Sequence, residues 1–202
     1  CAHKLVATCI LGVYSRLLID LNRHLEAPDL LHDHDDFIPI PGNQNLSQED
    51  LQQRLDEYYH PFHKVCSYHV DRLQKIHQMP VIFSFHSFPR HQTSYDKPFE
   101  WNFTLHYNED ERVANIFKDH FSTHFPDVKV GDNDPYNLKE LKTGGVLIHG
   151  ERRGLPYLLI EIPNDQMVEN DEIDHWSNVV SDILLTVPGK LEKELGQEKR
   201  AV

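Results

Sequence analysis

The chain has 202 residues, of which 39% are hydrophobic and 26% are charged, a balance typical of a globular protein with one core. Its formal charge of -12 at pH 7 argues against a nucleic acid or an anionic membrane as partner, since both attract basic surfaces. The three cysteines are widely spaced and form neither a C-x-x-C pair nor a secreted disulfide framework, and no apolar run reaches the roughly 18 residues of a membrane helix. This pattern indicates a cytoplasmic protein.

Residues 10–22 are mainly apolar and are predicted to form a buried strand. The run ends in a polar cluster, which comprises Arg16, Asp20, Asn22 and Arg23. On a strand Asp20 and Asn22 share one face, and the planar fork of Arg23 matches a carboxylate in a bidentate manner. One interpretation is therefore a binding site for a substrate carboxylate. The other is an internal Arg–Asp ion pair that fastens the end of a strand.

Residues 24–46 are rich in proline and acidic residues and are predicted to form a long loop, which covers a cleft. The run His32–Asp36 offers metal-binding side chains, but adjacent ligands in a loop lack the spacing of a preorganised site, so a solvated loop is preferred. A long helix should follow from Ser47, its N-cap, to about Met79. Pro61 should disturb this helix one turn earlier, near Glu57.

The second half alternates strands with helices. Strands are predicted at 80–88, 101–107, 128–130 and 155–162, and helices at 111–125 and 171–197, the latter broken near Pro188 and Gly189. Such alternation predicts an α/β three-layer sandwich with a mainly parallel, mixed sheet. Ligands of these sheets bind at the carboxyl ends of the strands.

Three apolar segments each end in polar groups that are costly to bury: Asn22 and Arg23, His86, and Glu161. We expect them to meet at one edge of the sheet. A neutral imidazole there can bind a divalent metal, a carboxylate can take a proton from metal-bound water, and Arg23 can hold an anionic substrate. The alternative for His86 is an imidazole bonded to the backbone. A lone Glu161 in an apolar strand needs either a cation or a raised pKa.

Residues 144–154 form a glycine-framed segment that carries His149, Arg152 and Arg153. An arginine here can polarise a scissile carbonyl or stabilise its oxyanion. The alternative is a surface loop in which Glu151 pairs with either arginine.

Six segments together resemble the N-formylglutamate amidohydrolase family, which is itself similar to zinc-dependent carboxypeptidases and aspartoacylases. They are residues 14–23, 40–43, 59–63, 86–88, 131–136 and 149–162. The resemblance implies the fold of zinc-dependent exopeptidases and a site in which Asn22 and Arg23 bind a substrate carboxylate, His86 binds zinc or another divalent metal, and Glu161 activates water. Arg16, His149 and one of Arg152 or Arg153 would contact the substrate or the transition state.

Members of that family normally begin with a further strand and loop whose histidine and acidic residues complete the metal site. This sequence opens with Cys1, so we expect one domain over residues 1–202 that lacks this segment. The expected function is metal-dependent hydrolysis of the amide bond of a small carboxylate-bearing N-formyl or N-acyl amino acid, such as N-formylglutamate, in histidine breakdown. Two alternatives stay open: a non-catalytic member that keeps the fold, and a carboxypeptidase-like enzyme that acts on peptides.

Overall fold

A computed structural model of the chain describes residues 1–77, 79–93, 95–141 and 144–198. Its larger sheet has the strand order β3-β6-β4-β5. These strands are β3 (Ile82–Phe88), β6 (Tyr157–Pro163), β4 (Phe103–His106) and β5 (Val130–Asp132). Strand β3 runs parallel to β6 and β4 parallel to β5, whereas β4 and β6 are antiparallel. The predicted mixed, mostly parallel sheet is confirmed.

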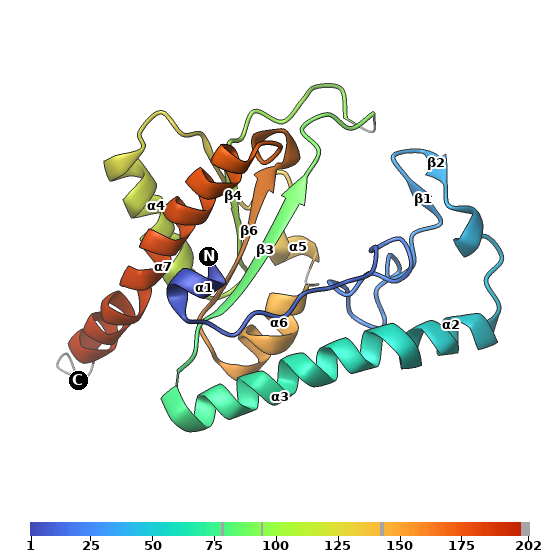
Figure 1. The fold of residues 1–202 in the computed structure, drawn as a ribbon, viewed down its shortest axis with the longest axis horizontal. Coiled ribbons are helices and arrows are strands. Elements are labelled where there is room, and N and C mark those ends of the chain that lie inside the picture. Colours follow the sequence, from blue (N-terminus) through green and yellow to red (C-terminus); the bar gives the residue numbers. More distant parts are fainter. Residues whose placement is uncertain (78, 94, 142–143, 199–202) are drawn as a thin grey trace.

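Helices lie on both sides of this sheet (Figure 1). Helices α4 (Arg112–His124) and α7 (Asn170–Glu198) lie on one side, with the short α1 (Ala2–Leu5) against α7. Helices α3 (His60–His77) and α6 (Gly145–His149) lie on the other side, and α5 (Leu138–Leu141) precedes α6. Within the part of the chain that the structure describes, no helix is both long and apolar enough to cross a membrane.

The main core lies between the sheet and the α4–α7 layer. In β4, Phe103 and Leu105 are fully buried, and the Phe103 ring contacts Phe117 and Phe121 of α4 and Trp176 of α7. Because successive strand residues point to opposite faces, the polar residues between them face the other way. The sheet therefore has one apolar face and one face that carries polar groups.

The predicted strand at residues 10–22 is wrong, because this segment has an irregular, turn-rich backbone. Leu11 and Val13 are largely exposed, and only Ile19 joins a small second cluster with Leu30 and Tyr59. The polar residues of the segment favour local bonds over a strand ladder: the backbone N–H of Asn22 donates to Asp20 Oδ1 at 2.8 Å, which forms an Asx turn.

The loop prediction for residues 24–46 holds for most of that range. It contains a small hairpin, β1 (His34–Asp35) paired with β2 (Ile38–Pro39), and the 3-10 turn η1 (Pro41–Asn43). Two further 3-10 turns lie later in the chain, η3 (Glu151–Arg153) after α6 and η4 (Asn164–Gln166) after β6.

The long helix after Ser47 is confirmed, and so is the effect of Pro61. The Ser47 hydroxyl accepts a hydrogen bond from Asp50 N, which caps α2 (Gln48–Arg54). A π-helical turn, η2 (Leu55–Tyr59), separates α2 from α3 at the point where the proline disrupts the preceding turn. Tyr59 of η2 and Val70 of α3 are buried, while Val65 and Ile76 of α3 are exposed.

The break predicted near Pro188 is wrong, because α7 continues through that residue. The buried side chains of Ile183, Val187 and Leu191 recur every four residues on one face. Packing of this stripe against the core offsets the hydrogen bond that the proline removes.

Candidate active site

The polar face of the sheet carries a row of four residues, one from each strand. His86 of β3 is the register partner of Glu161 of β6, Glu161 that of Thr104 of β4, and Thr104 that of Gly131 of β5. Register partners on neighbouring strands point to the same side of a sheet. At Gly131 a Cβ atom would lie 2.6 Å from the backbone oxygen of Asp134, so only glycine fits this end of the row. His86 and Glu161 thus meet on one face of the sheet, whereas the sequence predicted a meeting at its edge.

Both residues lie within their strands rather than at the ends. Two further strand residues follow His86 in β3, and two follow Glu161 in β6. The side chains therefore stand on the sheet face, where neighbouring strands fix their positions, and not in a loop.

Glu161 is a carboxyl group in an unusual environment. Burial raises its pKa to about 7, although the nearby positive charges of Arg16 and Arg23 act in the opposite direction. Its Oε2 atom is buried and has no hydrogen-bond partner among the described residues. A carboxyl group with a pKa near neutrality can both take up and release a proton at physiological pH.

The side chain of His86 is neutral at neutral pH. Burial lowers the pKa of His86, the charge of Asp20 raises it, and those of Arg16 and Arg23 lower it further. Its Nε2 atom lies 2.9 Å from Ser84 Oγ. The alternative prediction for His86 was a hydrogen bond to the backbone, but this contact is to the side chain of Ser84 in the same strand.

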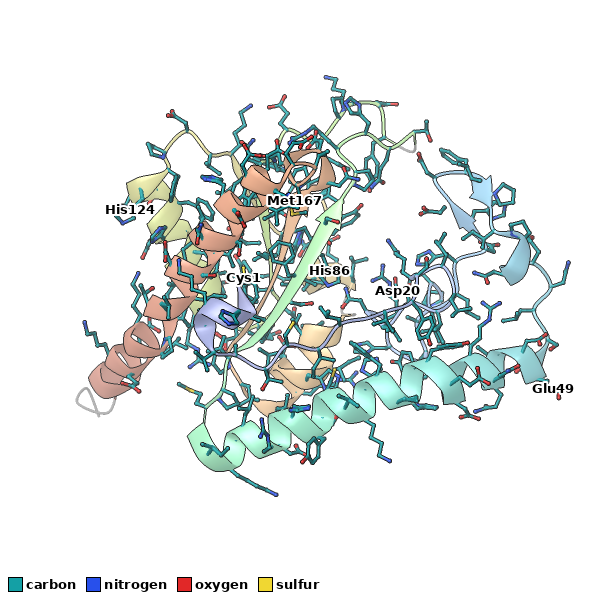
Figure 2. All side chains as sticks on the ribbon, in the orientation of Figure 1. Cys1, Asp20, Glu49, His86, His124 and Met167 are labelled. Atoms are coloured by element: carbon teal, nitrogen blue, oxygen red, sulfur yellow. The ribbon has the colours of Figure 1, made fainter. Side chains whose placement is uncertain are left out.

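A cluster of charges faces this row from the loop, and Figure 2 shows Asp20 beside β3, on which His86 lies. The buried Asp20 Oδ2 lies 3.1 Å from Arg16 Nη2, 3.4 Å from His32 Nε2 and 3.9 Å from Arg23 Nη1. Burial pushes the pKa of Asp20 upward, but His32 and the two arginines together hold it below its ordinary value. Asp20 is therefore an ionised, buried anchor for two arginines.

The guanidinium of Arg23 is partly engaged. Its Nε donates to Asp29 Oδ2 at 2.5 Å and its Nη1 to the backbone oxygen of Asn22 at 3.2 Å. The Asn22 side-chain oxygen accepts from Gly145 N at 2.6 Å, and the Tyr59 hydroxyl donates to the backbone oxygen of Arg23 at 2.7 Å. The Asn22–Arg23 segment is thus fixed between α6 and η2. The predicted ion pair is present, and carboxylate binding by these residues stays a prediction.

The structure places His149, Arg152 and Arg153 beside other partners. The buried His149 Nε2 lies 2.8 Å from Nδ1 of His63 in α3, and burial lowers the pKa of both imidazoles to about 4. Arg152 Nη2 lies 3.4 Å from His24 Nε2, and Arg153 pairs with Asp71 of α3.

Glu151 accepts hydrogen bonds from Asn108 and Tyr157, while Arg153 pairs with Asp71. These contacts differ from the alternative prediction, in which Glu151 pairs with Arg152 or Arg153. The positive charges of Arg16 and Arg23 act to lower the pKa of Glu161, so both arginines are within electrostatic range of the row.

Three residues in or near the row were given no role from the sequence: Thr104, His106 and Tyr136. The Tyr136 hydroxyl accepts from Gln92 Nε2 at 3.1 Å, and burial, with the charge of Glu161, raises the pKa of Tyr136. The alternation of Phe103 and Leu105 with polar residues was the available signal for Thr104 and His106, since it marks a second face of the strand.

The metal that the family resemblance implies requires a set of ligands. Catalytic zinc usually takes three protein ligands. His86 offers a neutral imidazole and Glu161 an unpartnered oxygen, but the described residues contain no group of three histidine, cysteine, aspartate or glutamate side chains placed to hold a metal ion. The described donors therefore do not fit a complete zinc site.

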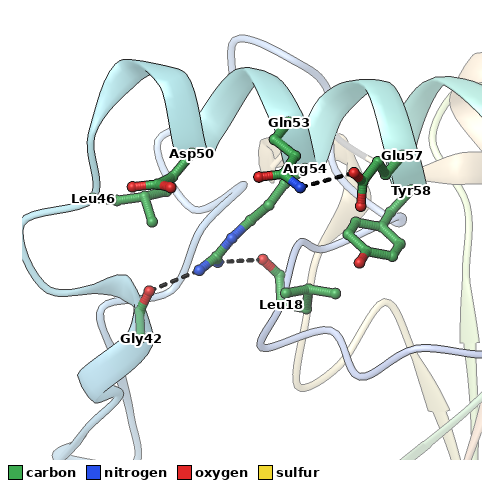
Figure 3. A pocket seen from close by; sticks show the side chains of 8 residues that line it. All are labelled: Leu18, Gly42, Leu46, Asp50, Gln53, Arg54, Glu57 and Tyr58. Atoms are coloured by element: carbon green, nitrogen blue, oxygen red, sulfur yellow. Dashed lines mark hydrogen bonds between the residues drawn. The ribbon is translucent and has the colours of Figure 1, made fainter.

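A cavity of about 370 Å³ lies elsewhere, between α2 and the residues around Leu18 and Gly42 (Figure 3). Arg54 spans it and donates to the backbone oxygens of Leu18 and Gly42, both at 2.7 Å. Because the Arg54 guanidinium already donates to backbone oxygens, we interpret these hydrogen bonds as a structural contact that holds the loop before α2 in place.

A family model described as N-formylglutamate amidohydrolase matches residues 1–168. The fold is similar to the crystal structure of a gene product from Agrobacterium tumefaciens, with 25% identity and a TM-score of 0.80 over 89% of this chain and 69% of that one. It is also similar to the crystal structure of N-formylglutamate amidohydrolase from Ralstonia eutropha JMP134, with 18% identity and a TM-score of 0.67 over 91% and 76% of the two chains. Comparison with curated protein sequences finds no match.

Proposed function

Because the chain belongs to the N-formylglutamate amidohydrolase family, we propose that it hydrolyses the amide bond of a small N-formyl or N-acyl amino acid, such as N-formylglutamate. The observation that carries the proposal is the buried carboxyl group of Glu161, whose pKa of about 7 suits a general base at neutral pH. Two arginines close to it supply positive charge for an anionic substrate. A role in histidine breakdown and a cytoplasmic location belong to the same proposal.

In this reaction Glu161 takes a proton from a water molecule whose oxygen attacks the formyl or acyl carbon. The C–N bond then breaks, and Glu161 returns the proton to the leaving nitrogen. The products are formate, or another carboxylic acid, and the free amino acid. Arg16 and Arg23, held by Asp20, bind the substrate carboxylate together with Asn22.

A divalent metal, expected to be zinc, is part of the proposal, with His86 as one ligand. Because the described donors do not form a set of three, we assign no step of the reaction to the metal. The metal content of the purified protein tests this part. One tightly held zinc per chain supports it, and a metal-free protein with full turnover contradicts it.

The catalytic roles predicted for His149 and for one of Arg152 or Arg153 are contacts to the substrate or the transition state, and for the arginine they include stabilisation of the oxyanion. A fall in kcat in Arg152→Lys or Arg153→Lys, with unchanged thermal stability, supports such a role. Unchanged kcat in both variants contradicts it.

A second candidate function is binding without catalysis. The observation that favours it is the lack of three metal ligands among the described residues. Release of formate from N-formylglutamate separates the two candidates, and a dipeptide offered in parallel tests for carboxypeptidase-like activity. We expect turnover of N-formylglutamate. Saturable binding of this compound without formate release favours the non-catalytic candidate.

A further inference from the structure

Two polar side chains of β4, those of Thr104 and His106, are buried beside Glu161 and have no part in the reaction described above. Thr104 is 0% and His106 1% exposed, and both face the side of the sheet that Glu161 occupies. Thr104 is the direct register partner of Glu161, and His106 is its diagonal neighbour. A buried hydroxyl and a buried imidazole cost free energy unless hydrogen bonds compensate, so their bonds indicate their role.

The tautomer of His106 follows from its contacts. Its Nδ1 atom lies 2.7 Å from the backbone oxygen of Tyr136, and a carbonyl oxygen only accepts, so Nδ1 carries the hydrogen. Burial lowers the pKa of His106 to about 4, so the ring is neutral at neutral pH. The Nε2 atom therefore has a free lone pair and is an acceptor.

The Nε2 lone pair has two neighbours. The Thr104 hydroxyl lies 2.8 Å away, and the same hydroxyl lies 3.3 Å from the backbone oxygen of Glu161, to which it can donate instead. Glu161 Oε2 lies 3.8 Å from Nε2 and has no hydrogen-bond partner among the described residues. With a neutral imidazole this contact is not an ion pair. An ionised carboxylate gains nothing from a lone pair, whereas a protonated carboxyl group can donate to it.

We propose that His106 is a positioning residue for Glu161: its Nε2 accepts a hydrogen bond from the carboxyl group of Glu161 while that group carries the proton taken from water. A small rotation of the carboxyl group closes the 3.8 Å separation, and Thr104 frees Nε2 by turning its hydroxyl to the backbone oxygen of Glu161. The proton stays on Oε2 while this bond exists, and the bond breaks when the carboxyl group turns and passes the proton to the leaving nitrogen. This inference rests on the proposed function, in which Glu161 is the base.

The contact should affect kcat and not KM. Arg16 and Arg23, which bind the substrate carboxylate in the proposed function, belong to a different segment and are held by Asp20. The hydrogen bond exists only after proton uptake, so its loss leaves the binding of the substrate unchanged. Without it the protonated carboxyl group has no acceptor for its proton in the interval between proton uptake and C–N cleavage, which makes proton uptake less favourable.

Two substitutions of the same residue separate this role from a structural one. In His106→Asn, the amide replaces Nδ1 and keeps the bond to the backbone oxygen of Tyr136, but no group replaces Nε2. In His106→Gln, the amide oxygen replaces Nε2 as an acceptor and the bond to Tyr136 is lost. We expect kcat to fall about tenfold or more in His106→Asn at unchanged KM and to stay within about threefold of the wild type in His106→Gln. Equal kcat values in the two variants, or a larger loss in His106→Gln, would overturn the proposal.

A second measurement does not depend on activity. In the Thr104→Val background the Thr104 hydroxyl is gone, so only Glu161 can donate to Nε2 of His106. We compare the nitrogen-15 resonance of this Nε2 at pH 6 in Thr104→Val and in Thr104→Val/Glu161→Leu. We expect the chemical shift of a hydrogen-bonded nitrogen in Thr104→Val and that of a nitrogen without a hydrogen bond in the double variant. An identical resonance in both proteins would refute the contact. A wild type without turnover counts against the proposed function, and the resonance then decides this inference alone.

Discussion

His86 and Glu161 are register partners on the adjacent parallel strands β3 and β6, so two residues from distant parts of the sequence stand side by side on one face of the sheet. The backbone ladder, and not a flexible loop, sets their separation. Both are partly buried, and the charges of Arg16 and Arg23 act on both. The pair therefore marks the centre of the candidate site more firmly than any single residue does.

Glu161→Gln should abolish turnover without loss of the fold. The amide has the same shape but cannot take a proton from water, and loss of a general base typically lowers the rate by about 10²- to 10⁴-fold. Steady-state kinetics with N-formylglutamate measure the effect, and calorimetry measures binding of the same compound to the variant. Glu109→Gln, the same change at an exposed residue, is the control. Turnover of Glu161→Gln within about threefold of the control would remove Glu161 from the mechanism.

The pH dependence of stability should also report on Glu161. The pKa of Glu161 is about 7 in the folded chain, whereas the ordinary value for a glutamate is 4.5. At a pH between these two values the folded state therefore binds more protons than the unfolded state. Stability contributed by this group therefore falls as the pH rises from about 4.5 and levels off above about 7. The full effect is about 3 kcal/mol.

Urea unfolding of the wild type and of Glu161→Gln from pH 4.5 to pH 8 checks this sign. The variant should lose less stability than the wild type over the interval, because its amide does not titrate. Parallel curves for the two proteins would show that the environment of Glu161 does not raise its pKa.

The sequence predicts the sheet well where apolar strands carry their own signal. The runs that became β3, β4 and β6 are apolar and bounded by polar or proline-containing segments, so their positions follow from sequence patterns alone, whereas the shared face of His86 and Glu161 depends on the register of β3 and β6. The short β5 begins two residues later than predicted, at Val130, because its register against β4 sets its limits.

Residues 10–22 show where such patterns fail. Their apolar content resembles that of a strand, but the side chains of Arg16, Asp20 and Asn22 bond to local and loop groups and fold the backbone into turns. Arg23, which follows this range, contacts Asp29 and the hydroxyl of Tyr59. The pattern of residues 10–22 gives no information about these two partners. The charge cluster was therefore predictable as a group of residue types, and its geometry was not.

Asp20→Asn should weaken both stability and substrate binding. Asp20 is buried and faces Arg16, Arg23 and His32, so the neutral amide leaves positive charge without its anionic partner. Removal of one partner of a buried ion pair typically costs about 3–5 kcal/mol, and the exposure of Arg16 places this case at or below the lower limit. We also expect a several-fold higher KM, because the arginines lose the group that orients them.

Asp29→Asn is the matched control for this prediction. Asp29 pairs with Arg23, but 43% of its side chain is exposed, so its removal should cost less than about 1 kcal/mol. Urea unfolding and steady-state kinetics of the two variants make the comparison. An equal effect of the two substitutions would contradict a special role for the buried carboxylate.

The hydrogen-bonded pair of His63 and His149 should make the fold sensitive to acid. Burial lowers the pKa of both imidazoles to about 4, whereas the ordinary value is 6.5. Between these values the unfolded chain binds more protons than the folded chain, so stability contributed by each group is complete above pH 6.5 and is lost as the pH falls toward 4. The loss amounts to about 3 kcal/mol for one such group.

Unfolding of the wild type, His149→Gln and His91→Gln between pH 7 and pH 4 measures this loss. His149→Gln should lose less stability than the wild type over this range, since its amide takes up no proton. The exposed His91 is the control, and its replacement should leave the curve of the wild type unchanged. If His149→Gln were as sensitive to acid as the wild type, burial of this pair would not be the source of the sensitivity, and protonation of other buried groups, with His106 first among them, would have to account for it.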